Sequence, residues 1–144
     1  MCPVENILIS LAPRHAENIL AGTKLVELRR RPMNISAGAT VWMYVKLPVG
    51  SIIGKVEVGA IHIGAPSTLW RRFGAVSGLT RTEFFDYFRG VTRGVALVLR
   101  DSKRLTRELS LEALRTIDRH FQPPQFFARL TLAQPLFQAI SADT

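Results

Sequence analysis

The sequence predicts an α+β domain, a mixed and largely antiparallel β-barrel of about five strands with short flanking helices. Three observations support this class. Short apolar or alternating stretches recur between turn signals, the helical stretches are short, and glycines interrupt the longest strand-like stretch. The sequence lacks the long amphipathic helices of a bundle and the regular strand–helix alternation of a doubly wound sheet. We expect residues 1–144 to form a single domain.

The first elements surround the most highly charged part of the chain. Residues 7–11 form an apolar run that predicts a buried strand. Pro13 begins a short helix, and Gly22 stands where a left-handed C-cap is expected. Residues 25–31 alternate as a strand with one core face does, and residues 40–46 are rich in β-formers. The sequence therefore predicts a helix between a first and a second strand, with a third strand after them.

The second half of the chain begins with the longest predicted strand, residues 52–63. Its Gly54 and Gly59 indicate bulges or a barrel corner. The remaining elements follow from capping signals and apolar runs. They are helices that begin at Ser67, at the capping box of Thr80 and at Ser110, a strand over residues 94–100 and an apolar segment over residues 124–130.

The chain is strongly basic. It has 19 Lys and Arg residues against 11 Asp and Glu residues, a formal net charge of +8. Most of the cations are Arg, whose planar fork binds phosphate with two hydrogen bonds and stacks on bases. This composition favours a nucleic-acid partner, with RNA or a modified nucleotide expected and DNA possible.

The composition also limits the compartment and the chemistry. Cys2 is the only cysteine, so we expect no intramolecular disulfide, and we predict a reducing, cytoplasmic compartment. The longest apolar run, residues 95–99, is too short to span a bilayer, so no membrane partner is expected. We predict neither a cofactor nor a metal, and we expect no ligand role for the scattered His15, His62 and His120; His62 is expected at a core or rim position. The sequence leaves the oligomeric state open.

A cluster of charged residues lies where the first helix turns into the second strand. Its members are Arg14, Lys24, Glu27, Arg29, Arg30 and Arg31. A fixed carboxylate among cations can accept hydrogen bonds from the amino groups of a base, while neighbouring Arg and Lys bind phosphate. The alternative is a solvated strand face on which Glu27 and Arg29 form a routine pair. We predict that these six residues bind nucleic acid.

A second candidate surface lies on the third strand. Trp42 and Tyr44 share one face of this strand with Lys46, and aromatic rings beside a cation can stack on bases. Burial of both rings in the core is the alternative. We include Lys46 among the predicted nucleic-acid-binding residues.

The segment Gly22-Thr23-Lys24-Leu25-Val26-Glu27-Leu28-Arg29 resembles the Gly-x-Lys-x-x-Glu-x-Arg signature of ASCH domains, which belong to the PUA-like superfamily. The resemblance extends over residues 6–130, to stand-alone ASCH proteins often described as predicted transcriptional regulators. Further similar motifs are Ser10 to Pro13, the Tyr44 strand, Ile53 to Val56, Leu69-Trp70, Ser77 to Leu79, Phe84 to Phe88 and Pro123 to Phe127.

The resemblance implies a PUA-like barrel with a cleft lined by Lys24, Glu27 and Arg29, and a role in binding RNA or modified bases. Because other ASCH proteins are described as ribonucleases, metal-independent RNA cleavage is the leading enzymatic alternative. Its candidate catalytic residues are Lys24 with Tyr44 or Ser10. A transcription-associated interaction module is a further hypothesis.

Some small ASCH relatives are amidohydrolases that deacetylate N4-acetylcytidine. They use the signature Lys, a Thr nucleophile three residues after it and a distant Glu. Here Glu27 occupies the position of the Thr, and a carboxylate cannot replace the hydroxyl nucleophile. Residues 77–79, where the acid is expected, include no Glu. We therefore predict no hydrolysis of N4-acetylcytidine.

Overall fold

The structure is a computed structural model that describes residues 4–142, so Cys2 lies outside the described residues. The strands are β1 (Asn6–Leu11), β2 (Val26–Arg29), β3 (Thr40–Val45), β4 (Ser51–Gly64), β5 (Gly94–Ser110) and β6 (Ala128–Leu130). The helices are α1 (Pro13–Ala21), α2 (Pro66–Phe73), the 3-10 helix η1 (Gly74–Val76), α3 (Arg81–Tyr87), α4 (Leu111–Ile117) and α5 (Pro135–Ser141).

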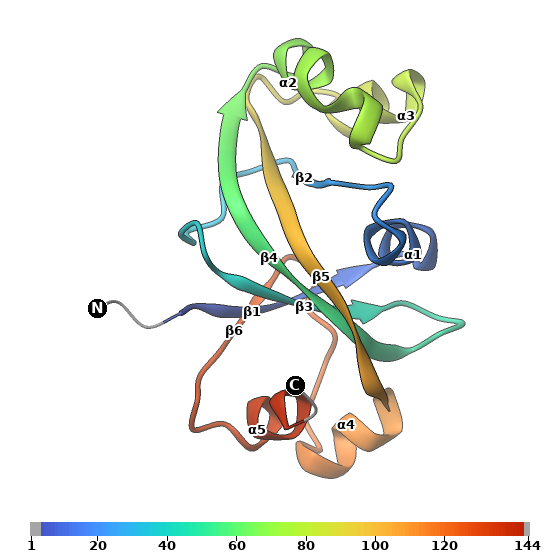
Figure 1. Cartoon of the computed structure of the whole chain (residues 1–144), viewed down its shortest axis with the longest axis vertical. Coiled ribbons are helices and arrows are strands. Elements are labelled where there is room, and N and C mark those ends of the chain that lie inside the picture. Colours follow the sequence, from blue (N-terminus) through green and yellow to red (C-terminus); the bar gives the residue numbers. More distant parts are fainter. Residues whose placement is uncertain (1–3, 143–144) are drawn as a thin grey trace.

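All six strands belong to one sheet, in the order β2-β5-β4-β3-β1-β6. Neighbouring strands are antiparallel except β1 and β3, which are parallel. The long strands β4 and β5 curve along the molecule (Figure 1), and their register shifts beside Gly54 and across Gly59, where bulges were expected. The predicted α+β class with a mixed, largely antiparallel sheet is confirmed. Within residues 4–142 the strand pairing forms an open row, so the word barrel describes the curvature and not a closed ring of hydrogen bonds.

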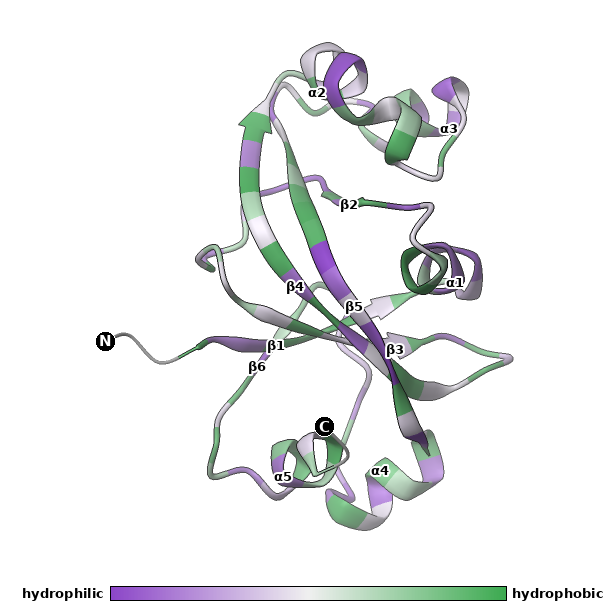
Figure 2. Cartoon of the chain, in the orientation of Figure 1, coloured by the Kyte–Doolittle hydropathy of each residue, from purple (hydrophilic) through white to green (hydrophobic). Residues whose placement is uncertain are grey.

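Two pairs of helices, α2 with α3 and α4 with α5, lie at opposite ends of the curved sheet, and α1 lies between them (Figure 1). At one end, α2 and α3 cover a cluster of buried residues that includes Val26, Phe84 and Phe88. At the other end, α4 and α5 cover a cluster that includes Trp42 and Ile140. A third cluster, built mainly from β1, β3, β4 and β5, fills the middle. Hydrophobic residues in Figure 2 follow the central strands, whereas the part of β5 beyond Leu99 is mostly hydrophilic.

The rings of Trp42 and Tyr44 belong to the core, so the predicted base-stacking face on β3 is wrong. Trp42 is 2% exposed and Tyr44 is 3% exposed. The Trp42 Nε1–H donates to the Asn6 side-chain oxygen at 3.0 Å, and its ring packs edge-on against Phe137 of α5. The predicted strand parity holds, but α4 and α5 cover this face, and α5 was not expected.

Two other elements differ from the sequence prediction. Strand β2 ends at Arg29 instead of residue 31, and all four of its residues are buried, on both faces. Strand β5 continues to Ser110 instead of ending at residue 100, because it pairs with β4 along almost its whole length. The second half of β5 is charged and largely exposed, so neither an apolar run nor a clear alternation indicates a strand there.

Candidate functional site

A cleft of about 600 Å³ lies between α1, β2 and α3. Five of the predicted site residues line it, and they come from three separate parts of the chain. These five are Ser10, Lys24, Glu27, Arg29 and Lys46. The other predicted residues are not among its lining residues; they are Arg14, Arg30, Arg31 and Tyr44.

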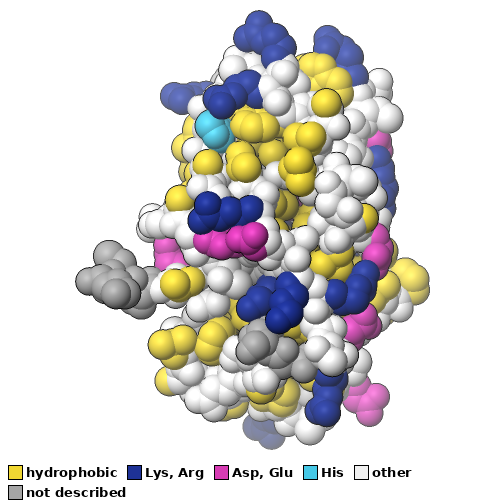
Figure 3. Space-filling view, in the orientation of Figure 1, with side chains coloured by type: hydrophobic (Ala, Val, Ile, Leu, Met, Phe, Trp, Pro, Cys, Tyr) yellow, Lys and Arg dark blue, Asp and Glu magenta, His cyan; other side chains and the backbone are white. Residues whose placement is uncertain are grey.

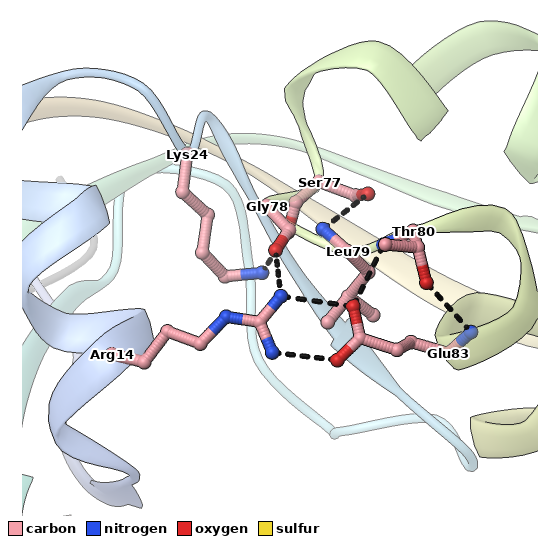
Figure 4. Close-up of polar contacts among 7 residues, drawn as sticks. All are labelled: Arg14, Lys24, Ser77, Gly78, Leu79, Thr80 and Glu83. Carbon is pink, nitrogen blue, oxygen red and sulfur yellow. Dashed lines mark hydrogen bonds and ion pairs between the residues drawn. The ribbon is translucent and has the colours of Figure 1, made fainter.

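Lys24 is a buried cation inside this cleft. Helix α1 ends at Gly22 in the left-handed conformation, with φ at 82°, and the backbone N–H groups of Thr23 and Lys24 both donate to the Asn18 carbonyl. This reversal directs Lys24 toward the 77–79 loop, where its Nζ donates to the Ser77 carbonyl at 2.5 Å (Figure 4). Only 2% of the residue is exposed, and burial lowers the pKa of the ammonium group. Within residues 4–142 no ion pair includes Lys24.

Glu27 and Arg29 form a buried ion pair on one face of β2. Their side chains are each 10% exposed, and the closest nitrogen and oxygen are 3.0 Å apart. Arg29 also donates through Nη1 to the Phe126 carbonyl at 3.0 Å, while its buried Nε has no hydrogen-bond partner in the described structure. The alternative of a solvated Glu–Arg pair is therefore wrong. The face of β2 that carries Glu27 and Arg29 lines the cleft, where the ion pair holds the carboxylate in a fixed position.

Arg14 joins α1 to α3 instead of facing the cleft. Its guanidinium binds both carboxylate oxygens of Glu83, at 2.6 and 2.9 Å, and also donates to the Gly78 carbonyl at 2.7 Å (Figure 4). Glu83 completes the predicted capping box by accepting from the Thr80 backbone N–H. The Arg14 guanidinium, followed by the Thr80 N–H, lowers the pKa of Glu83 to about 2. Because these donors are already occupied, a direct phosphate contact by Arg14 is not supported.

Arg30 and Arg31 lie just beyond the cleft, past the end of β2. Arg30 donates to the backbone carbonyls of Tyr87 and Arg89, so it ties this segment to the end of α3. The Arg31 guanidinium is exposed and lies 4.3 Å from the ring centroid of Phe126. Both residues border a neighbouring hollow that also includes Arg29. The structure thus places the two arginines beside the cleft, in different environments.

The catalytic candidates Ser10 and Tyr44 differ in their access to the cleft. The Ser10 hydroxyl lies at the cleft but donates to the Pro124 carbonyl at 2.7 Å. Tyr44 lines a different hollow, beside Ser10 and Lys46. Lys46 follows β3, is exposed and lines both spaces. Of the three catalytic candidates, Lys24 is therefore the most deeply placed in the cleft.

Several cleft residues were not predicted from the sequence, and His15 and Tyr87 are two of them. His15 lines the cleft, and its Nδ1 is buried without a hydrogen-bond partner in the described structure. Burial, and then the charge of Lys24, lowers its pKa. Tyr87 of α3 also lines the cleft and donates its hydroxyl to the Leu28 carbonyl at 2.9 Å. The position of His15 directly after Arg14 on α1 was the available signal, but its side chain reaches the cleft only through the packing of α1 beside β2.

Positive charge is spread widely over the molecule. Figure 3 shows separate Lys and Arg side chains on one face, several of them next to Asp or Glu. Arg100 pairs with Glu57 at 2.8 Å, and Arg104 pairs with Glu17 at 2.9 Å. On this face the cations therefore do not form a single continuous basic patch.

Among residues 4–142, no three His, Cys, Asp or Glu side chains are grouped closely enough to hold a metal ion. In the same range, no helix is both long and apolar enough to cross a bilayer.

Comparison with known proteins identifies the family. No family model matches the chain. A Zymomonas mobilis protein named ASCH domain-containing ribonuclease is 40% identical over 118 residues, which cover 82% of this chain and 79% of that protein. The crystal structure of ASCH from Zymomonas mobilis superposes with a TM-score of 0.89 at 35% identity, over 96% of each chain. The human THYN1 protein, solved in complex with DNA that contains 5-methylcytosine, shares the fold, with a TM-score of 0.61 at 10% identity over 96% of this chain and 97% of that one. On these matches in sequence and structure, the chain belongs to the ASCH domain family.

Proposed function

We propose that this protein binds RNA through the cleft between α1, β2 and α3. The observation that carries the proposal is that one cleft contains both a buried ammonium group, that of Lys24, and a carboxylate held in a fixed position, that of Glu27. Lys24 has a carbonyl partner but no ion-pair partner within residues 4–142, so it can bind a phosphate oxygen. Glu27 is held by Arg29 and can accept a hydrogen bond from the amino group of a base. The relative named a ribonuclease supports RNA as the ligand.

The binding proposal is tested by changing Lys24 without changing the shape of the core. In Lys24→Met the buried side chain keeps a similar length and loses its charge, so the fold should be retained. We expect the affinity for a labelled single-stranded RNA, measured by fluorescence anisotropy, to fall about tenfold or more, because a hydrogen bond between charged groups is lost. Lys103→Met removes an exposed lysine outside the cleft and serves as the matched control. Equal affinities for the two variants would contradict the proposal.

RNA cleavage is a second candidate function, favoured by the relative named a ribonuclease and by two cleft residues suited to proton transfer. Burial lowers the pKa of both His15 and Lys24. Neutral His15 can accept the proton of a ribose 2′-hydroxyl as its oxygen attacks the adjacent phosphorus. The bond to the 5′-oxygen then breaks, the leaving oxygen takes a proton from water, His15 returns its proton to the solvent, and a 2′,3′-cyclic phosphate remains. The charged form of Lys24 stabilises the phosphate in the transition state.

Cleavage is tested with an end-labelled RNA and with the same RNA carrying one 2′-deoxyribose. We expect cleavage at every accessible ribose and none on the 3′ side of the deoxyribose, because the attacking hydroxyl is missing there. His15→Gln and Lys24→Met should each lower the rate by about 100-fold or more. Parallel reactions with and without EDTA test whether cleavage is metal-independent. Cleavage at the deoxyribose would contradict the proposed chemistry. N4-acetylcytidine should remain intact in the same assay, since Glu27 replaces the required hydroxyl.

A further inference from the structure

Two further hollows adjoin the cleft and extend it on both sides. One, of about 590 Å³, shares Ser10, Lys46 and Gln125 with the cleft and continues to Arg115; we call it the Arg115 hollow. The other, of about 580 Å³, shares Arg29, Tyr87 and Gln125 with the cleft and continues to Arg31 and Phe126; we call it the Arg31 hollow. Gln125 lines all three spaces, and the cleft shares further lining residues with each hollow, so the three spaces adjoin one another; we call them together the groove.

The charges of the three spaces differ in a systematic way. The central cleft contains three carboxylates, Glu27, Glu83 and Asp86, and each of them forms an ion pair with an arginine. Neither side hollow has a carboxylate among its lining residues. The Arg31 hollow is lined by three successive arginines, and the Arg115 hollow by Lys46 and Arg115. Acceptors suited to a base therefore lie in the middle, and cations suited to phosphates lie on both sides.

The side hollows also present apolar surface. In the Arg31 hollow the guanidinium of Arg31 lies over the Phe126 ring, 4.3 Å from its centroid, and forms a flat cationic platform. The Arg115 hollow is lined by Tyr44, Leu47, Pro123 and Pro124, and Leu47 is 77% exposed. Each of the three volumes lies within the range of about 300–1,000 Å³ that is usual for small-ligand sites. Each space is thus large enough for part of a nucleotide chain.

We propose that the groove binds an internal nucleotide of a single strand, with its base in the central cleft and its 5′ and 3′ phosphates in the two side hollows. This inference rests on the proposed RNA binding and deepens it by defining the ligand. A strand that continues in both directions satisfies the cations at both ends of the groove. A free nucleoside satisfies neither end. A base paired in a duplex has its amino group engaged and cannot present it to Glu27.

The inference is tested with three probes that share one base. Cytidine has no phosphate, cytidine 3′,5′-bisphosphate has one on each side, and the trinucleotide ApCpA has both phosphates within a strand. We expect the bisphosphate and ApCpA to bind about 100-fold more tightly than cytidine in isothermal titration calorimetry, about tenfold for each phosphate. Cytosine is chosen because its amino group is the donor that a Glu side chain reads.

Two variants test the two ends separately. Arg31→Gln and Arg115→Gln, at residues that line a side hollow but not the cleft, should each lower the affinity for ApCpA about tenfold and leave the affinity for cytidine unchanged. The matched controls are Arg93→Gln and Lys103→Gln, which remove exposed cations that line none of the three spaces.

Three results would overturn the two-sided groove. The first is equal affinity of the wild-type protein for cytidine and ApCpA. The second is a loss of ApCpA affinity in only one of the two variants. The third is a loss in the control variants as large as the loss in the test variants. Each of these leaves RNA binding by the cleft intact. The proposed function itself fails if neither the three probes nor a longer single-stranded RNA binds at all.

Discussion

Lys24 and Glu27 are both buried, but their environments give them different roles. Glu27 has a partner in Arg29, so its charge is compensated inside the protein. Among residues 4–142, Lys24 donates to the Ser77 carbonyl and forms no ion pair, although the charge of Glu27 favours its ammonium form. Burial of an ammonium group without an ion pair is unfavourable for folding. An anionic ligand supplies a further counterion. We therefore assign base recognition to Glu27 and contact with the strand's backbone at the cleft to Lys24, while the cations of the side hollows bind the flanking phosphates.

Glu27→Gln separates base recognition from charge. The amide still accepts a hydrogen bond from Arg29, but the ion pair is lost, so we expect the free energy of unfolding to fall by about 1–3 kcal/mol. Discrimination between nucleosides that differ at the amino group should fall by about 1–3 kcal/mol, the range for a good base-edge contact. Titrations with cytidine and N4-acetylcytidine, together with urea unfolding, measure the two effects.

Glu57→Gln is the matched control, because it makes the same charge change in the Glu57–Arg100 pair outside the cleft. It should leave nucleoside discrimination unchanged. If Glu27→Gln retains the discrimination of the wild type, Glu27 does not read the base, and the cleft is a phosphate site only.

His15 makes stability depend on pH. Burial lowers its pKa below 6.5, Lys24 and Arg14 act in the same direction, and Glu27 and Glu83 oppose the shift. The unfolded chain therefore binds a proton at a higher pH than the folded protein does. The contribution of neutral, buried His15 to the free energy of unfolding is fully present above pH 6.5. It is lost as the pH falls through the lower pKa that His15 has in the folded state. Between about pH 7 and 5, Tm should fall less for His15→Gln than for the wild type.

His120→Gln controls for this measurement, because His120 is exposed and lies outside the cleft. Its Tm profile should follow that of the wild type. A His15→Gln profile that also parallels the wild type would show that burial of His15 does not affect proton binding.

At the scale of the elements, α3 is held in place by its first turn. Thr80 caps the helix by accepting from the Glu83 backbone N–H at 3.2 Å, while the Glu83 side chain binds the Thr80 backbone and Arg14 of α1. One capping box therefore both starts α3 and fixes its distance from α1. This distance determines the width of the cleft.

Thr80→Ala should lower the free energy of unfolding by about 0.5–2 kcal/mol, the usual effect of removing an N-cap side chain. Thr82→Ala changes a nearby exposed threonine of the same helix, which does not serve as its N-cap, and should have a smaller effect in chemical denaturation. Equal losses for both variants would mean that the cap does not stabilise α3. We also expect Thr80→Ala to weaken RNA binding, because Glu83 loses support on one side of the cleft.

At the scale of the whole molecule, binding should depend on salt. Neutralising a phosphate releases counterions, and each contact with a single strand contributes about −0.7 to the slope of log K against log salt. For ApCpA, with two phosphates, we expect a slope of about −1.4. Cytidine, which has no phosphate, should give no slope and is the control. A flat response for ApCpA would contradict phosphate binding in the groove.

Many surface cations already have acidic neighbours, so the net charge of +8 overstates the charge available to a ligand. In the side hollows Arg29 is paired with Glu27 of the cleft, but no carboxylate lines either hollow itself. For the whole molecule, the positions of the carboxylates therefore indicate where a polyanion can bind better than the total charge does.

The sequence by itself determined the class of the fold, most of its elements and the residues of β2 that form the cleft. Local signals were sufficient there. Pro13 and Gly22 delimit α1, the Thr80 capping box starts α3, and Gly54 and Gly59 lie at register shifts. These features depend on backbone geometry within a few residues, which the sequence encodes directly.

Only the tertiary structure decided which charges are free and which surfaces are covered. Arg14 is engaged by Glu83, 69 positions later in the chain, and no local pattern indicates this contact. Tyr44 and Trp42 are buried because α4 and α5 pack over β3. His15 reaches the cleft because α1 packs beside β2, and β5 extends because β4 offers a partner. Such contacts join residues far apart in sequence, so they depend on how the elements pack and not on local propensity.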